Sequence, residues 1–338
     1  MGLGNEVFPW AKAYLASREL GFGLLQPPWG LNPRDYRTEF GTPRLDWVGH
    51  AALRAVLPSE TVTDEMVRST GRIDYGEAIR VLDAEHGWSR RRALLLMHEG
   101  MSGGYLGIAR ARDFLRSRLL GRKPGQEGRE PDPARLHVVV HIRLGDFGGT
   151  SAGPRPGEWN ESVPVEWYRS VLAALRARLG DTLHVDILSD DQVRVAGLLP
   201  EWAREDSRRR STLEDLSVMA SADLLICSVS SYSMLAAFLS DAPYIWYRPH
   251  LGEHGGFLSI WGHEPDQRTG PTAANVLRER QDAADPALTR GVAMDTGDDL
   301  PGWLADYLGT RTALRRRSAD LIHYGVVPRH AAVSNHRV

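Results

Sequence analysis

The sequence predicts an α/β protein built around a parallel sheet. Short apolar stretches that suit buried strands alternate with segments of helical periodicity through the second half of the chain. The predicted strands cover residues 136–143, 183–188, 224–229 and 242–247. Strands and helices at this spacing are typical of βαβ units, whose crossovers are right-handed.

Composition restricts the class of protein. At 338 residues two domains are favoured, and 42% hydrophobic with 25% charged residues is typical of a globular chain. A net charge of -2 gives no overall field for nucleic acid or membrane, and the sequence offers no support for peripheral membrane contact. The single cysteine, Cys227, excludes internal disulfides. Without a spanning segment or a signal-peptide pattern, the chain is expected to be cytoplasmic.

A charged segment rich in glycine and proline interrupts the chain at residues 121–135, GRKPGQEGREPDPAR. This composition is typical of a linker or an exposed loop. We therefore expect an N-terminal domain over 1–130 and a second domain over 131–310. Residues 311–338 are expected to form a tail or a helix that packs back.

Polar residues follow the ends of the predicted strands. His141 and Arg143 end the first strand, and Ser230 and Ser231 follow the third. In open α/β sheets this carboxyl edge is where ligands bind. The planar guanidinium of Arg143 fits phosphate oxygens, although a strand-end arginine can equally pair with an aspartate of a neighbouring loop. The serines can offer hydroxyls and helix N–H groups to an anion, or simply cap a helix.

Three aspartates near these strand ends raise further possibilities. Asp215 lies near the start of a helix that opens with the capping-box pattern Ser211 to Glu214. Its carboxylate can accept hydrogen bonds from a base or ribose, or complement the helix dipole. Asp190 and Asp191 are adjacent, so on a strand they would point to opposite faces. We therefore expect no metal site.

The first residues suggest a second ligand contact. Gly2, Gly4 and Asn5 precede a helical pattern, which predicts a loop whose backbone approaches a ligand closely, with Pro9 in the first turn of the helix. The strand that would feed such a loop is missing, so we expect a late start or a lost upstream piece. The tryptophans and tyrosines between 21 and 121 suit core packing better than sugar stacking.

An ordered set of motifs resembles the bacterial α-1,2-fucosyltransferases and, more loosely, the α-1,6- and protein O-fucosyltransferases. His141-x-Arg143-x-Gly145-Asp146 resembles the HxRxGD motif, and GLGN at 2–5 resembles the N-terminal GLGNQLFQYA motif. LSDD at 188–191, Asp215 and SSYS at 230–233 resemble later motifs in the same order. The resemblance spans the first twenty residues and about 136–247.

The resemblance implies a GT-B fold, in which two Rossmann-like domains face each other across a cleft. It also implies an inverting, metal-independent transfer from GDP-fucose, with no further cofactor. Each role follows from a matched motif position. Arg143 would hold the β-phosphate, His141 and Asp215 the guanosine, Ser230 and Ser231 the phosphates, and Gly4 and Asn5 would face the donor from the other domain. Asp146 and Glu6 are the candidates for the general base.

The expected function is transfer of a sugar, with L-fucose the expected one, to a hydroxyl of a glycan or natural product. Leu144 replaces the second arginine of the motif and Glu6 its glutamine. Because of these departures, an alternative function remains, in which the protein binds a nucleotide sugar without catalysis. A serine hydrolase using Ser231 is disfavoured because Val229 and Ser233 occupy the glycine positions of a nucleophile elbow. A dinucleotide dehydrogenase is disfavoured because no G-x-G-x-x-G motif follows any predicted strand.

Overall fold

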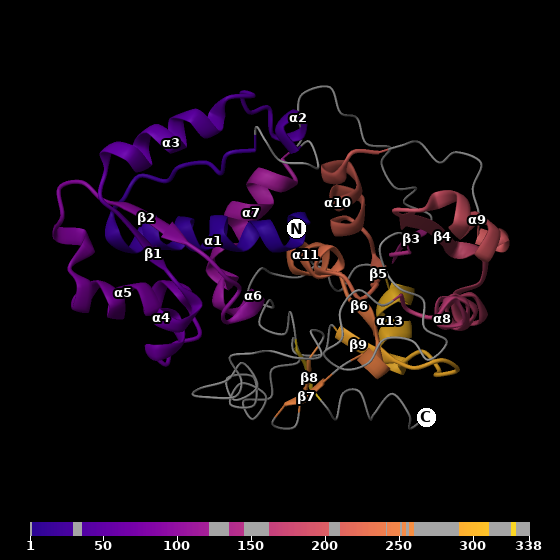
Figure 1. The fold of residues 1–338 in the computed structure, drawn as a ribbon. Coiled ribbons are helices and arrows are strands. Elements are labelled where there is room, and N and C mark those ends of the chain that lie inside the picture. The colour runs from indigo at the N-terminus through magenta and orange to yellow at the C-terminus, as the bar shows by residue number, and fades with distance from the viewer. Residues whose placement is uncertain are drawn as a thin grey trace.

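A computed structural model gives the fold of the chain (Figure 1). It describes residues 2–29, 36–121, 135–144, 162–202, 210–240, 242–250, 252–254, 257–259, 291–310 and 326–328. Among these residues, no helix combines the length and the apolar character needed to cross a membrane. The chain is a mixed α/β protein whose two principal sheets are parallel, which confirms the predicted fold class.

The larger sheet has five parallel strands in the order β4-β3-β5-β6-β9. In chain order they are β3 (Leu136–Ile142), β4 (Leu183–Ser189), β5 (Leu224–Ile226), β6 (Tyr244–Tyr247) and β9 (Gly291–Met294). Numbered from β3, this order is 2-1-3-4-5, one of the two common orders of doubly wound sheets. Every residue of β3 is buried, as its run of β-branched residues predicts for a central strand.

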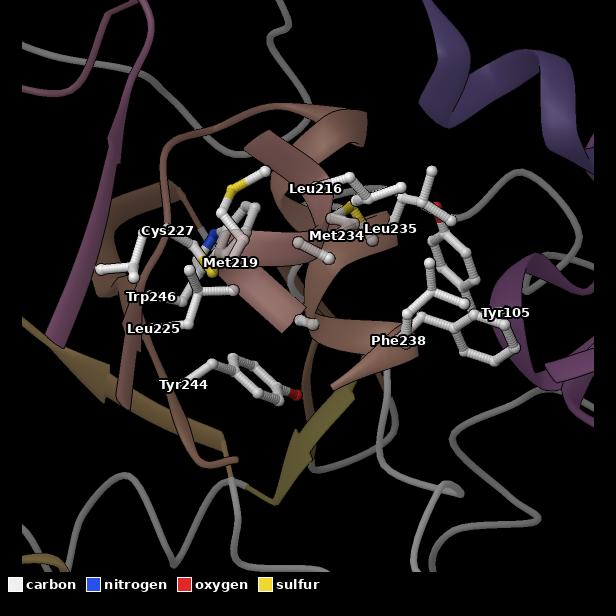
Figure 2. Packing of buried hydrophobic residues seen from close by; sticks show 14 of the residues in the cluster. Tyr105, Leu216, Met219, Leu225, Cys227, Met234, Leu235, Phe238, Tyr244 and Trp246 are labelled. Carbon is white, nitrogen blue, oxygen red and sulfur yellow. The ribbon is translucent and has the colours of Figure 1, made fainter. Parts of the chain in front are cut away.

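Helices cover both faces of this sheet. They are α8 (Val165–Leu179), α9 (Gln192–Leu198), α10 (Thr212–Ala220), α11 (Ser231–Leu239) and α13 (Gly302–Thr310). α8 packs with α13, and α10 packs with α11. Figure 2 shows α11 in the core, where Met234, Leu235 and Phe238 are fully enclosed. The capping box predicted for α10 is present, with both the Ser211 and Glu214 hydrogen bonds formed.

The N-terminal half holds a two-stranded parallel sheet of β1 (Ser59–Val62) and β2 (Leu95–His98). Its helices are α1 (Leu3–Leu20), α2 (Tyr36–Phe40), α3 (Asp46–Val56), α4 (Asp64–Ser69), α5 (Tyr75–His86), α6 (Gly104–Gly107) and α7 (Arg112–Leu119). Short 3₁₀ turns lie at Trp88–Arg90, Ala109–Ala111, Gly180–Thr182, Pro200–Trp202 and Arg248–His250. A small antiparallel sheet joins β10 (Val326–Pro328), β8 (Phe257–Ser259) and β7 (Gly252–His254).

Two expectations about the N-terminus are wrong. The segment Gly2 to Asn5 is not a loop before a helix, because α1 already begins at Leu3 with Gly2 as its N-cap. Pro9 consequently lies inside the helix rather than in its first turn. A proline there cannot donate to the carbonyl of Asn5, four residues earlier. The first turn of α1 therefore keeps a main-chain oxygen without its usual helical donor.

The two halves meet along α11. The guanidinium of Arg112, on α7, is buried and donates to the carbonyls of Phe238 (2.7 Å), Leu239 (3.1 Å) and Ser240 (2.7 Å) at the end of α11. A cation at this end also complements the helix dipole. The start of α11 lies against α1, and Figure 1 shows the N-terminus beside α11. The N-terminal half thus holds α11 at both ends.

Candidate functional site

The carboxyl ends of β3 and β5 define the candidate site. β3 lies between β4 and β5. After β3 the next strand, β4, lies toward one edge of the sheet, whereas after β5 the next strand, β6, lies toward the other edge. In doubly wound sheets, ligands bind in the crevice at this point of reversal. His141 and Arg143 arrive there from β3, and Ser228 and Ser230 arrive from β5.

A hydroxyl cluster holds His141. Its Nδ1 lies 2.6 Å from Ser233 Oγ and 3.0 Å from Ser228 Oγ. Ser233 Oγ also accepts from the N–H of Ser228 at 3.1 Å, so its own proton can donate to Nδ1. This arrangement favours the His141 tautomer that carries its proton on Nε2. Within the described part of the chain, Nε2 has no hydrogen-bond partner, so it is a donor available to a ligand.

His141 is neutral at physiological pH. Burial and, to a smaller extent, the positive charge of Arg143 lower its pKa to about 4, against the opposing effect of Asp190. The ring also makes an edge-on contact with Tyr232, with centroids 5.5 Å apart. His141 is therefore suited to hydrogen bonding and to stacking, but not to carrying a positive charge for a phosphate.

Arg143 is engaged in an ion pair. Its Nε lies 3.2 Å from Asp190 Oδ2, while Asp190 Oδ1 accepts from the N–H of Leu144 at 2.9 Å. This is the pairing with a neighbouring loop that the sequence left open. The arginine side chain remains 21% exposed, so the ion pair orients it at the edge of the sheet. Asp191 acts separately, as the N-cap of α9, which agrees with the expectation that the two aspartates diverge.

The serines at the start of α11 have different roles. Ser230 is the N-cap, and its Oγ accepts from the N–H of Tyr232 at 3.2 Å, as the capping interpretation predicts. Ser231 lies against Gly4 of α1, where an ideal Cβ would be 2.3 Å from the Ser231 carbonyl oxygen. Only glycine permits this approach. The structure thus brings together the N-terminal motif and the serine motif, 227 positions apart in the chain (231 − 4).

Asn5 and Glu6 share the first turn of α1 with Gly4. The Oδ1 atom of Asn5 is buried and has no hydrogen-bond partner among the described residues. A buried polar atom without a partner costs free energy unless a ligand or water satisfies it. Glu6 is half-buried. Asp146, the other candidate base, lies outside the described residues.

Asp215 lies in the first turn of α10 and is half-buried. Its pKa is raised to about 6, mainly by burial and also by the carboxylates of Glu214 and Glu39, against the opposing charge of Arg210. No hydrogen bond to its carboxylate occurs in the described part of the chain. Perturbed carboxylates of this kind concentrate at functional sites.

Sequence reasoning missed Glu39, which comes from α2 in the other half of the protein. Its carboxylate accepts from the N–H groups of Thr212 (3.2 Å) and Leu213 (2.7 Å) at the start of α10. The Tyr232 hydroxyl donates to the carbonyl of Thr212. No local pattern marks Glu39, because its partners are more than 170 positions away. Ser228 and Ser233 were also missed as partners of His141, although both lie in the serine-rich stretch that follows β5.

A histidine and carboxylate cluster lies at the opposite end of the sheet, formed by His137, His184 and Asp186. Their ligand-type atoms are within 4.8 Å of one another. His137 Nε2 is 2.9 Å from Asp186 Oδ2, a hydrogen-bond distance, whereas two ligands of a tetrahedral zinc ion are separated by about 3.3 Å. The other ring nitrogen of His137 is buried without the acceptor that usually orients a metal-binding histidine. We interpret the cluster as a hydrogen-bonded pair with a neighbouring histidine.

Comparisons with known proteins identify no relative. No family model, no curated protein and no solved structure matches the chain.

Proposed function

We propose that this protein is a glycosyltransferase that uses a GDP-sugar, with L-fucose as the first choice, and transfers it to a hydroxyl of a glycan or natural product. The observation that carries the proposal is the meeting of three separate motifs at one sheet edge: His141 and Arg143 at the end of β3, Ser230 and Ser231 after β5, and Gly4 of α1. A cytoplasmic location, inversion and independence from metal are part of the same proposal, as is a GT-B arrangement.

The guanosine would be held by His141 and Asp215. A neutral imidazole with Nε2–H offers a donor, and the carboxylate of Asp215 offers acceptors to the N–H groups of a guanine base. The lack of a partner for this carboxylate supports the assignment. Binding of N–H donors would stabilise its charged form and offset the penalty of burial.

The diphosphate would lie between Arg143 and the start of α11. In the transfer step, the acceptor oxygen bonds to the anomeric carbon while the bond from that carbon to the β-phosphate oxygen breaks. GDP leaves with the electron pair, and Arg143 and the helix dipole stabilise the negative charge that develops on it. The acceptor proton passes to a carboxylate, for which Glu6 is the described candidate and Asp146 the second.

The ion pair of Arg143 favours one competing function, a module that binds the nucleotide sugar without catalysis. An arginine committed to Asp190 orients the strand end but does not by itself stabilise a leaving group. Such a module would bind GDP and leave every GDP-sugar intact. The two functions therefore differ in turnover and not in binding.

A thermal-shift panel of nucleotides tests the donor first. Selective stabilisation by GDP species, absent with UDP and dTDP, is expected. Failure of GDP to stabilise the protein would reject both functions. Transfer from GDP-fucose, measured as release of GDP that depends on a hydroxyl acceptor, then separates the enzyme from the binding module.

Variants at the ion pair test the role of Arg143. Arg143→Ala is expected to weaken GDP binding at least about thirtyfold, because a charge-assisted contact worth about 2 kcal/mol or more is lost. Asp190→Asn should weaken it less, since the guanidinium remains. Equal losses in the two variants would mean that Arg143 acts only by holding Asp190. Arg169→Ala, which removes a surface ion pair with Glu166, is the matched control.

A further inference from the structure

The helix α3 presents its apolar side outward. Figure 1 shows it at the margin of the N-terminal half, away from the five-stranded sheet, and none of its residues is buried. The exposed set, called here the α3 apolar face, consists of Leu45, Trp47, Val48, Ala52, Ala55 and Val56. Leu45 is 65% exposed, Trp47 39%, Val48 44% and Val56 74%. These apolar residues lie on one side of a single helix, so they form one small patch on the surface.

Two of the three polar side chains of α3, those of Asp46 and His50, face the protein. Asp46 accepts from the N–H of Trp29 at 2.7 Å, and His50 Nε2 lies 2.9 Å from the carbonyl oxygen of Gln26. Positions 46, 50, 53 and 57 share one side of a helix, and all four are less exposed than the apolar face. An ordinary surface helix buries its apolar stripe and exposes its polar one. The inward side of α3 combines two polar residues with Leu53 and Leu57, whereas Trp47, Val48 and Val56 face outward, so burial within this chain does not account for these three apolar residues.

The exposed charge beside this face is positive. Arg44 and Arg54 are exposed and have no ion-pair partner among the described residues. Asp46 is the only acidic residue of α3, and it is used in the inward contact with Trp29. An occupant of the face should therefore be apolar where it meets Val48 and negatively charged around it.

We propose that the α3 apolar face docks on an anionic lipid surface, with Trp47 and Val48 inserted at the headgroup boundary and Arg44 and Arg54 against lipid phosphates. This combination of apolar and aromatic residues with flanking arginines is what interfacial helices use. At 11 residues α3 is about 16 Å long, about half the thickness of a bilayer core, so it lies on the surface and does not span it.

The size of the face disfavours a second copy of the chain as occupant. A helix about 16 Å long and about 10 Å wide covers on the order of 160 Å². A stable protein interface buries about 800 Å² on each partner. A lipid surface has no such requirement, because each inserted side chain and each arginine contributes on its own.

Flotation of the full chain with vesicles tests the proposal. Binding is expected to vesicles of equimolar phosphatidylcholine and phosphatidylglycerol, to fall on raising the salt concentration, and to be weak with phosphatidylcholine alone. Equal binding to the two kinds of vesicle, or to neither, would overturn it. The assay contains no nucleotide, so its result is independent of the proposed transferase.

Two variants and one control locate the contact. Val48→Asp should lower vesicle binding about tenfold or more, since it places a charge in the inserted face, and Arg54→Gln should lower it about fivefold. Val193, on α9 and 88% exposed, gives the control Val193→Asp, which should bind as the unchanged chain does. Unchanged melting temperatures exclude unfolding as the cause. Equal loss in Val48→Asp and Val193→Asp would reject the site, and a dimer that Val48→Asp converts to monomer would assign the face to a second copy.

Discussion

Replacing Asp215 by asparagine should stabilise the protein at neutral pH. The carboxylate has no hydrogen-bond partner in the described structure, and burial raises its pKa from 3.8 to about 6. At 1.36 kcal/mol per pKa unit, keeping it ionised in the folded state costs about 3 kcal/mol. Asparagine has the same shape without the charge. It forfeits a favourable interaction with the dipole of α10 of about 0.5 kcal/mol, which leaves a net gain of about 2–3 kcal/mol.

The sign of the pH dependence follows from the direction of this pKa change. Because the folded pKa lies above the unfolded one, the folded state holds the proton more tightly between about pH 3.8 and about pH 6. The stability contributed by the protonated carboxyl is present below this range and is lost as the pH rises through 6. The gap between Asp215→Asn and the unchanged chain should therefore be small near pH 4 and fully developed at pH 7.

Urea unfolding at several pH values measures this gap. Asp181→Asn is the matched control, since Asp181 is exposed in the turn before β4, and its curve should follow that of the unchanged chain. The reasoning is refuted if Asp215→Asn is no more stable than the unchanged chain at pH 7, or if its gain is the same at pH 4 and pH 7. If Asp215 binds guanine, Asp215→Asn should also lose affinity for GDP. The negative charge of the carboxylate would then be needed for binding GDP, although it destabilises the fold.

Two further predictions concern the contacts that hold α11. Gly4→Ala should destabilise the protein by about 3 kcal/mol, because the new Cβ meets backbone atoms of Ser231 that cannot rotate away. The control Gly197→Ala, on the open side of α9, should be neutral or stabilising by up to about 1 kcal/mol. Thermal and urea unfolding measure both variants. Arg112→Met should lower the free energy of unfolding by about 3–5 kcal/mol, because three buried carbonyls at the end of α11 lose a charged donor. The control Arg178→Met, at an exposed position, should change it by less than about 0.5 kcal/mol. Equal effects of the two variants would contradict the role of Arg112 in holding the end of α11.

The parts of the fold that the sequence predicts are those set by neighbours in the chain. The apolar run at 136–142 specifies a buried strand through its own composition, and Ser211 and Glu214 form the predicted capping box because both partners lie within one helical turn. The start of α1 was misjudged for a related reason. Glycines at 2 and 4 disfavour a helix locally, but the close packing of Gly4 on Ser231 requires a residue without a side chain there, and this tertiary contact overrides the propensity.

Partners could not be predicted in the same way. His141 and Arg143 were expected at the sheet edge, but the contacts of His141 with Ser233 and of Arg143 with Asp190 depend on which strands are neighbours. A pattern of strands and helices leaves that order open, since 2-1-3-4-5 and other doubly wound orders share the same periodicity. Glu39 is the extreme case, because its carboxylate accepts a hydrogen bond from the N–H of Leu213 at the start of α10, a helix of the other half.

The contacts that hold α11 at both ends affect how a ligand would bind. Arg112 fixes the end of this helix to α7, and Gly4 fixes its start to α1, so the two halves cannot separate there without exposing buried carbonyls. Asn5 follows Gly4 in the same turn of α1. The backbone of Asn5 is therefore held in place by the neighbouring contact of Gly4 with Ser231. Because Asn5 Oδ1 is buried without a partner among the described residues, we expect the affinity of a nucleotide to fall in Asn5→Ala if the nucleotide satisfies this oxygen.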